Sequence, residues 1–400
     1  MIWIAVIIPI IGAFVMLRWH REHLTWWEII IPMLVAVTFT LIFKFTVEKI
    51  QTNDTEYRGA LVMEARYYEY WSTYVRKTCS RTTKVGKSTI TTYYDCSYCD
   101  ENPPHWTVLD NVGNEYEISQ AYYNSLIKRW NSREKFVELG RTIRGGGWGC
   151  GQDGEMFTIS WDGNPLTSDA TVTSNWYENR VQAAHSVFDF PEITEDDKKT
   201  YHLVDYPEIN GYMQNTVLGD TVKWMSPRER RKGEKLIQHS CGYWGPKKHA
   251  NIWVVLFVDK PSLSATMQEA YWEGGNDNEV TICIGLDSKT RQIQWVKPFS
   301  WTPNKTLLVN LREDIMISKN FDFEKVKLVI DKNMSTYERK DFKEFNYLTV
   351  DPPTWAIVTT FLVTILSTFG LCYWGVVNNY TADKDNLWKT IEKNTWGRWR

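Results

Sequence analysis

The sequence lacks an excess of charge of either sign. Its 46 lysines and arginines nearly balance its 48 aspartates and glutamates, which gives a formal net charge of -2. Domains that bind nucleic acid through bulk charge carry a basic excess, so this balance predicts no nucleic-acid partner. The composition is 43% hydrophobic and 14% aromatic, which excludes low-complexity disorder for the chain as a whole.

Short motifs of common catalytic sites are missing as well. There is no Gly-x-Ser-x-Gly elbow and no His-Glu-x-x-His zinc motif. The segment from Gly145 to Gly154 holds six glycines in ten positions, yet no Gly-Lys-Ser/Thr follows, so it is not a phosphate loop. We interpret it as a surface loop between strands or, alternatively, as a binding loop that presents Trp148. The sequence favours a protein that is not an enzyme.

Long apolar runs stand out in the sequence. Met1–Leu17 has no charged side chain, and the basic residues Arg18 and Arg21 follow it. A cleavable signal peptide would begin with basic residues, so this order predicts an uncleaved membrane helix. Ile29–Phe43 is a second, shorter run. The third, Trp355–Val377, has 23 residues without a charge and is long enough to cross a membrane.

Basic residues orient these runs. Arg18 and Arg21 lie between the first two runs, and the end of the chain carries five more, at Lys384, Lys389, Lys393, Arg398 and Arg400. The positive-inside rule places both groups in the cytoplasm if the chain crosses the membrane three times. The predicted parts are a transmembrane hairpin at 1–46, a span at 355–377 and a cytoplasmic tail at 378–400. The predicted location is the inner membrane of a bacterium or a phage-infected host, as a multi-pass protein with a periplasmic outer domain.

Cysteine placement agrees with an oxidising compartment for the outer domain. Six of the seven cysteines lie between the second and third runs. We predict a disulfide between Cys79 and Cys96, closing a hairpin, with a zinc site at Cys79, Cys96 and Cys99 as the alternative. The sequence does not decide the disulfide partners of Cys99, Cys150, Cys241 and Cys283.

The outer domain is predicted to have two parts. Residues 50–225 are rich in β-branched and aromatic residues and favour a β-rich domain, with one helix at Ser119–Trp130 capped by its serine. Residues 227–350 favour the order α-β-α-β-β-α, with a basic helix capped by Ser226 and a buried strand at Asn251–Asp259. The expected fold class is an α+β membrane protein with three transmembrane helices and this two-part outer domain.

The second part contains a recognisable succession of elements. An amphipathic helix leads to Asn251–Asp259, a helix ends at Tyr271–Trp272, and a Gly/Asn/Asp turn leads into a strand pair. In this succession residues 228–320 resemble the TPM domain, an α/β module of membrane-anchored bacterial and thylakoid-associated proteins. The resemblance implies a module outside the membrane and, as an alternative function, a phosphatase-like, metal-dependent hydrolase. Lys297–Phe299 stands where this family often has a glycine-rich segment.

Carboxylates accompany the turn and its strand, at Glu273, Asp277, Glu279 and Asp287. Hard cations prefer such oxygen ligands, although the spacing is not that of an EF-hand. Calcium is therefore a hypothesis for this position, and no other cofactor is expected.

The functional prediction is an integral membrane protein whose outer domain binds a protein partner or supports envelope assembly. Its partners would be the lipid bilayer and an envelope protein, and the sequence leaves its oligomeric state open. Tryptophan suits surfaces where one end of a side chain is apolar and the other wet, so Trp106 and Trp148 are candidate partner-binding residues. A further alternative is a phage-encoded envelope or superinfection-exclusion factor.

Overall fold

The chain has a mixed α and β architecture and divides into two compact units. The helical unit comprises Met1–Asp54, Trp176–Asp189 and Phe342–Arg400, and the mixed unit comprises Thr55–Asn175 and Phe190–Asp341. The computed structural model describes residues 7–19, 26–85, 88–130, 134–139, 152–184, 190–207, 209, 213–221 and 224–378.

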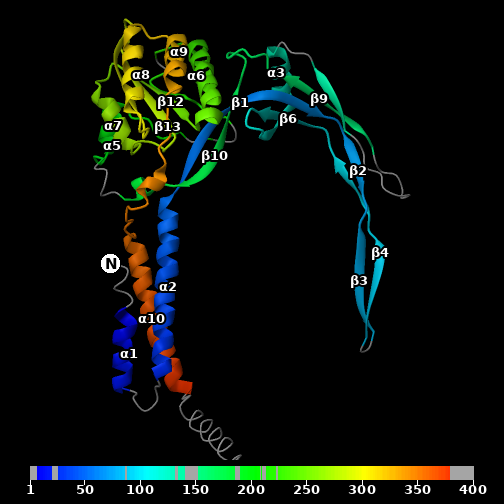
Figure 1. The fold of residues 1–400 in the computed structure, drawn as a ribbon, viewed down its shortest axis with the longest axis vertical. Helices are drawn as coiled ribbons and strands as arrows, with labels where there is room; N and C mark the ends of the chain where they lie inside the picture. Colours follow the sequence, from blue (N-terminus) through cyan, green and yellow to red (C-terminus); the bar gives the residue numbers. More distant parts are fainter. Residues whose placement is uncertain are drawn as a thin grey trace, which may run out of the picture. The chain divides into compact units, whose positions relative to one another are not determined.

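Three helices of the helical unit lie side by side (Figure 1): α1 (Ile7–Trp19), α2 (Trp26–Thr52) and α10 (Thr354–Asn378). Of the described helices, two are long and apolar enough to cross a membrane, through Ile30–Thr52 and Thr354–Leu371. Only 22% of each of these segments is buried, so neither is packed like the core helix of a soluble domain. The described part of α1 is shorter, at 13 residues.

The side chains of α2 and α10 are distributed the opposite way from those of a water-soluble bundle. Ala36, Thr40, Thr360, Thr364 and Thr368 are fully buried, and each of the last three hydroxyls donates a hydrogen bond to the carbonyl four residues earlier. Large apolar side chains are exposed instead, among them Leu34, Ile42, Phe45, Leu362 and Leu366. Small and hydroxyl-bearing residues are typical of contacts between membrane helices, whereas soluble helices bury their apolar stripe.

The first half of the mixed unit, here the β lobe, is an antiparallel sheet covered by one helix. Its described strands follow the order β7-β6-β1-β9-β8, and β10 also pairs with β1. The helix α3 (Gln120–Arg129) begins at Ser119, whose side chain accepts from Tyr122 N at 3.2 Å, as the sequence predicts. The strands are β1 (Asn53–Tyr68), β6 (His105–Asp110), β7 (Glu115–Ile118), β8 (Lys135–Leu139), β9 (Gly154–Ser160) and β10 (Ala170–Glu178).

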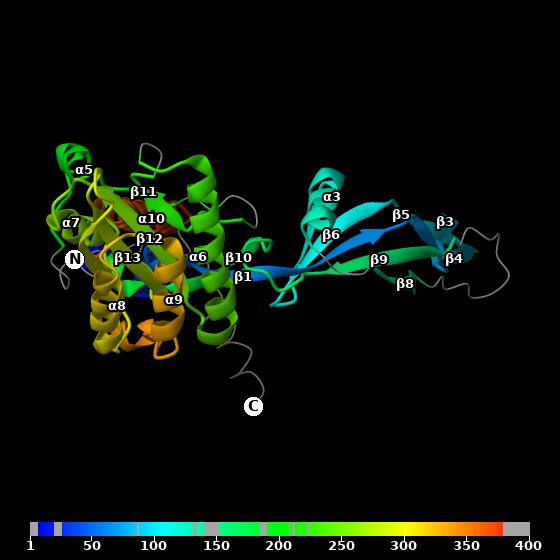
Figure 2. The same cartoon turned by 90° about the horizontal axis from the view of Figure 1, so that it is seen from above.

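The second half, here the α/β lobe, is built on a described sheet of four strands, β11-β12-β13-β14. The first three run parallel and the last is antiparallel to β13. Figure 2 shows α6, α8 and α9 on one side of the sheet, with α5 and α7 on the other. The strands are β11 (Val217–Gly219), β12 (Asn251–Val258), β13 (Glu279–Leu286) and β14 (Ile293–Phe299); the helices are α5 (Glu195–Tyr201), α6 (Pro227–Lys248), α7 (Leu263–Tyr271), α8 (Lys305–Ile317) and α9 (Phe323–Met334).

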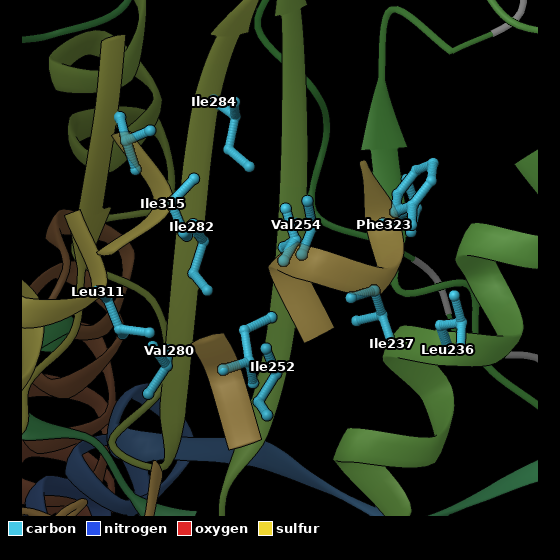
Figure 3. Packing of buried hydrophobic residues seen from close by; sticks show 14 of the residues in the cluster. Leu236, Ile237, Ile252, Val254, Val280, Ile282, Ile284, Leu311, Ile315 and Phe323 are labelled. Atoms are coloured by element: carbon cyan, nitrogen blue, oxygen red, sulfur yellow. The ribbon is translucent and has the colours of Figure 1, made fainter. Parts of the chain in front are cut away.

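The core of the α/β lobe follows from the two-residue period of its central strands. On β12, Ile252 and Val254 face the α6, α8 and α9 side, and Trp253 and Val255 face the α7 side. Every residue of β13 is buried. A strand covered on both faces reads as a continuous apolar run, which is why the sequence shows one here. Figure 3 shows the larger cluster, with Ile282, Ile284, Leu311, Ile315, Ile237 and Phe323 among its members.

The structure moves one predicted boundary. β11 ends before residue 226, where the sequence places the start of the α/β part, yet it pairs in parallel with β12. With three residues, β11 is too short to show a period of its own.

The long strand β1 joins the two lobes of the mixed unit. Its first half packs on α6 at backbone distance: a Cβ on Gly245 would lie 1.9 Å from the carbonyl oxygen of Gly59. Asn278 Nδ2 donates to Tyr57 O at 2.7 Å, which ties the same half to the turn before β13. Its second half pairs with β6 and β9 in the sheet of the β lobe.

An ion-pair cluster completes this junction. The Arg339 guanidinium donates to Asp277 Oδ2 from Nε at 3.0 Å and from Nη2 at 2.6 Å, and Nη2 also donates to Glu56. Both carboxylates are almost fully buried. Arg339 therefore connects β1, the turn before β13 and the segment that leads out of the mixed unit.

We expect Arg339→Met to lower the free energy of unfolding of the detergent-solubilised chain by about 3–5 kcal/mol, because it leaves the buried Asp277 without its counter-charge, whereas Glu56 keeps Arg58 at 2.7 Å. Arg228→Met is the control, since Arg228 is exposed on the first turn of α6. Urea unfolding followed by tryptophan fluorescence measures both. Equal midpoints for the two variants would contradict the role given to Arg339.

Candidate functional site

Two narrow β-ribbons extend from the sheet of the β lobe. β2 (Trp71–Val75) pairs with β5 (Tyr98–Asn102), and β3 (Thr78–Val85) pairs with β4 (Ser88–Asp95), both antiparallel. We name residues 71–102 the arm; Figure 1 shows it leading away from β1 and β6. Among the described strands, β3 and β4 pair only with each other. Because a lone two-stranded ribbon is marginally stable in water, other interactions must hold the arm.

A disulfide joins Cys79 to Cys96 at the junction of the two ribbons, with a Cα–Cα distance of 5.8 Å. It is the pair that the sequence predicts. Cys99 is disulfide-bonded too, so the alternative zinc site at Cys79, Cys96 and Cys99 is wrong, because their thiolates are consumed in disulfides. Cys241 and Cys283 are free and buried, and burial raises the pKa of both thiols.

The base of the arm is an aromatic and polar cluster on the sheet. Tyr68 stacks on His105 with ring centroids 4.6 Å apart, and Trp71 contacts the same imidazole at 5.8 Å. Tyr68 Oη donates to Glu115 Oε1 at 2.8 Å, and Thr107 donates to the same oxygen at 2.5 Å. Although burial opposes it, these hydrogen bonds lower the pKa of Glu115. The cluster therefore fixes the arm where it leaves the sheet.

The surface of the β3–β4 ribbon is aromatic and mainly basic, whereas Asp95, Asp100 and Glu101 are exposed carboxylates nearer the β2–β5 ribbon of the arm. Ile90, Tyr93, Tyr94 and Tyr98 are all exposed by half or more of their surface, and tyrosine is enriched at protein interfaces because its ring is apolar and its hydroxyl polar. Between Thr78 and Tyr94 the sequence has three basic residues and no acidic one. Such a surface complements an acidic partner with apolar side chains.

The sequence analysis missed these tyrosines. Their signal was a run of threonines and tyrosines between two cysteines, with three basic residues and a single acidic one, Asp95. Of the two tryptophans predicted instead, Trp106 is half-buried on β6 and stacks on Tyr67 at 5.4 Å, beside the core under α3. Its ring thus contributes to packing, and only its outer part is accessible to a partner. Trp148 lies outside the described residues.

The four carboxylates proposed for calcium do not form one site. Glu273, Asp277 and Glu279 lie before or at the start of β13, whereas Asp287 follows its end. Eight residues of extended strand separate the two positions, roughly 26 Å. Asp287 caps a turn by accepting from Thr290 N at 2.6 Å. The described residues contain no group of three or more His, Cys, Asp or Glu side chains placed to hold a metal.

Glu279 and Asp277 have structural partners. Glu279 accepts from the hydroxyl of Tyr206 and from Asn276 N. Burial raises the pKa of Asp277 to about 7; Arg339 opposes this shift, and the nearby Glu56 adds to it. Arg339 pairs with Oδ2 of Asp277, which gives this carboxylate a role in joining the turn to β1.

No protein-family model, curated protein or solved structure matches this chain. The resemblance of residues 228–320 to the TPM domain therefore stays a prediction.

Replacing both Cys79 and Cys96 by serine is expected to loosen the arm locally. Closing a loop of this length, with a sequence separation of 17, stabilises by about 3 kcal/mol in the chain-entropy description. Hydrogen exchange should therefore accelerate at the amides of β3 and β4 and stay unchanged at those of β12 and β13. The exposed pair Thr82→Ser and Thr91→Ser serves as control, and unchanged exchange in the cysteine variant would contradict the prediction.

Proposed function

We propose that this protein is a membrane-anchored binding protein of the bacterial envelope. Three helices, α1, α2 and α10, hold it in the inner membrane, and its periplasmic portion binds a protein partner through the arm. The observation that carries the proposal is the disulfide-linked ribbon of the arm, whose exposed surface is aromatic and basic. The α/β lobe, with its TPM-like succession of elements, serves in this proposal as the rigid support.

The membrane part of the proposal is supported by the inverted pattern of α2 and α10, with threonines inside and large apolar side chains outside. A pocket of about 470 Å³ at the end of α2 adds to this support. Its lining combines Phe45 and Trp176, both exposed, with Lys49 and with Arg180, which pairs with the lining carboxylates Glu48 and Glu178. Aromatic and basic side chains together are typical of the level of lipid headgroups.

The binding part of the proposal is supported by how little the arm contributes to the fold. The described side chains at 81–84 and 89–95 are all exposed, so they bury no core of their own. None of the described strands pairs with either outer edge of the β3–β4 ribbon, and strand addition to such edges is a common mode of peptide recognition. An extended segment of a partner protein can pair with these strand edges, and acidic side chains on it complement the exposed basic residues of the ribbon.

The proposed topology predicts the outcome of reporter fusions to the intact chain. Alkaline phosphatase, which is active only in the periplasm, should give activity when fused at residue 345 and none when fused at residue 395. A cytoplasmic reporter at the same two positions should give the reverse pattern. Activity of alkaline phosphatase at residue 395 alone would invert the topology and refute the proposal.

A photo-crosslinking amino acid in place of Tyr93 is expected to capture the partner in intact cells. The same amino acid in place of Tyr347 is the matched control, because both tyrosines are 72% exposed and Tyr347 lies outside the arm. Adding Tyr94→Ser and Arg81→Ser should lower the yield at position 93 by about tenfold, as expected for loss of interface hot spots. Equal capture at the two positions, or capture insensitive to these substitutions, would contradict binding through the arm.

A further inference from the structure

The α/β lobe has an open sheet edge of its own. β14 is an outermost strand of the four-stranded sheet. Its start is covered by the chain after α8, where Ile293 N donates to Lys319 O at 2.7 Å. From Gln294 to Pro298, no described strand pairs with its outer side. Pro298 has no N–H to donate, which is the arrangement of an edge strand whose proline nitrogen faces outward.

A groove runs along this open edge. Its volume is about 480 Å³, and the consecutive residues Gln294–Pro298 line one wall. The other wall is α8, through Leu308, Val309 and Met316. Leu307, Leu311 and Ile315 on the same helix point into the core, so α8 packs with one face and lines the groove with another. The groove therefore combines backbone hydrogen-bonding groups with apolar side chains.

The charge of the groove has one sign. Lys297 and Arg312 line it, and the described lining contains no aspartate or glutamate. Arg312 is exposed and has a distant ion pair with its neighbour Glu313, with Nε and Oε1 3.8 Å apart. Lys297 is held by Glu269 at 3.3 Å and donates to Thr266. Arg312 is thus the cation most available to an acidic ligand.

We propose that this groove binds an extended peptide segment of a protein partner with alternating apolar and acidic side chains. The segment adds a fifth strand to the outer edge of β14, along Gln294–Val296. One apolar side chain enters between β14 and α8, and a neighbouring carboxylate pairs with Arg312. This mode of recognition combines main-chain hydrogen bonds for affinity with a side-chain pocket for specificity. The site is separate from the arm and goes beyond the function proposed for it.

The geometry favours a peptide over the other occupants. A lipid chain would leave the outward N–H and C=O groups of the strand without partners, which costs free energy at a buried contact. Pro298 limits pairing at one end of the edge, so the segment that binds is short and its register is defined. A second copy of the chain is the remaining occupant, and the experiment distinguishes it.

The test uses the full chain in nanodiscs and a fluorescein-labelled decapeptide of alternating valine and glutamate as the probe. Fluorescence anisotropy should detect saturable binding that weakens about tenfold when alternate peptide nitrogens are methylated, because methylation removes main-chain pairing. Val309→Glu should weaken binding by a similar factor. Ile317→Glu is the matched control on the same helix, since it is 75% exposed and does not line the groove.

A peptide of alternating valine and lysine should bind weakly to the native chain and more tightly to Arg312→Glu. Tyr93→Ser should leave all these affinities unchanged, which separates this site from the arm. Binding that tolerates methylation, or that Val309→Glu leaves intact, would overturn the proposal. Concentration-dependent dimers that Val309→Glu abolishes would overturn it in favour of a second copy.

Discussion

A single guanidinium group, that of Arg339, is held between two carboxylates that the fold removes from water. Glu56 comes from the start of β1 and Asp277 from the turn before β13. Buried carboxylates are costly without a counter-charge, so separating these segments would leave Asp277 unpaired. The backbone contact of Gly59 with Gly245 depends on the same approach of β1 to α6. The first half of β1 is fixed in this way, and its second half pairs with β6 and β9 in the sheet of the β lobe.

The mixed unit combines the α/β lobe, which has a buried core, with the arm, which has none. β12 and β13 are covered on both faces, and their side chains form a contiguous core with three helices. The arm has no comparable core, and a covalent bond between Cys79 and Cys96 replaces the missing packing. Its surface is therefore available for contacts. The arm and the groove beside β14 share open strand edges, apolar side chains and basic charge, which suits extended acidic partners.

Much of this architecture could be predicted from local patterns. The apolar segments of α2 and α10, the caps at Ser119 and Ser226, the strand at β12 and the disulfide of Cys79 all rest on residues within a short window. The carboxylates around β13 were interpreted as one ligand set because they are close in sequence. An extended strand separates its two ends widely, and the eight residues of β13 place Asp287 apart from the others.

The sequence by itself determined the long helices and the central strand β12, but not the short strand β11, and it determined which segments are apolar enough for a membrane and where a disulfide closes. These properties depend on short-range periodicity, capping and composition. The tertiary structure alone decided that Arg339 meets Glu56 and Asp277, that Trp106 packs while Tyr93 is exposed, and that β14 keeps an open edge beside α8. Those outcomes depend on contacts between residues far apart in the chain. A local sequence pattern does not predict which surfaces remain exposed once these contacts form.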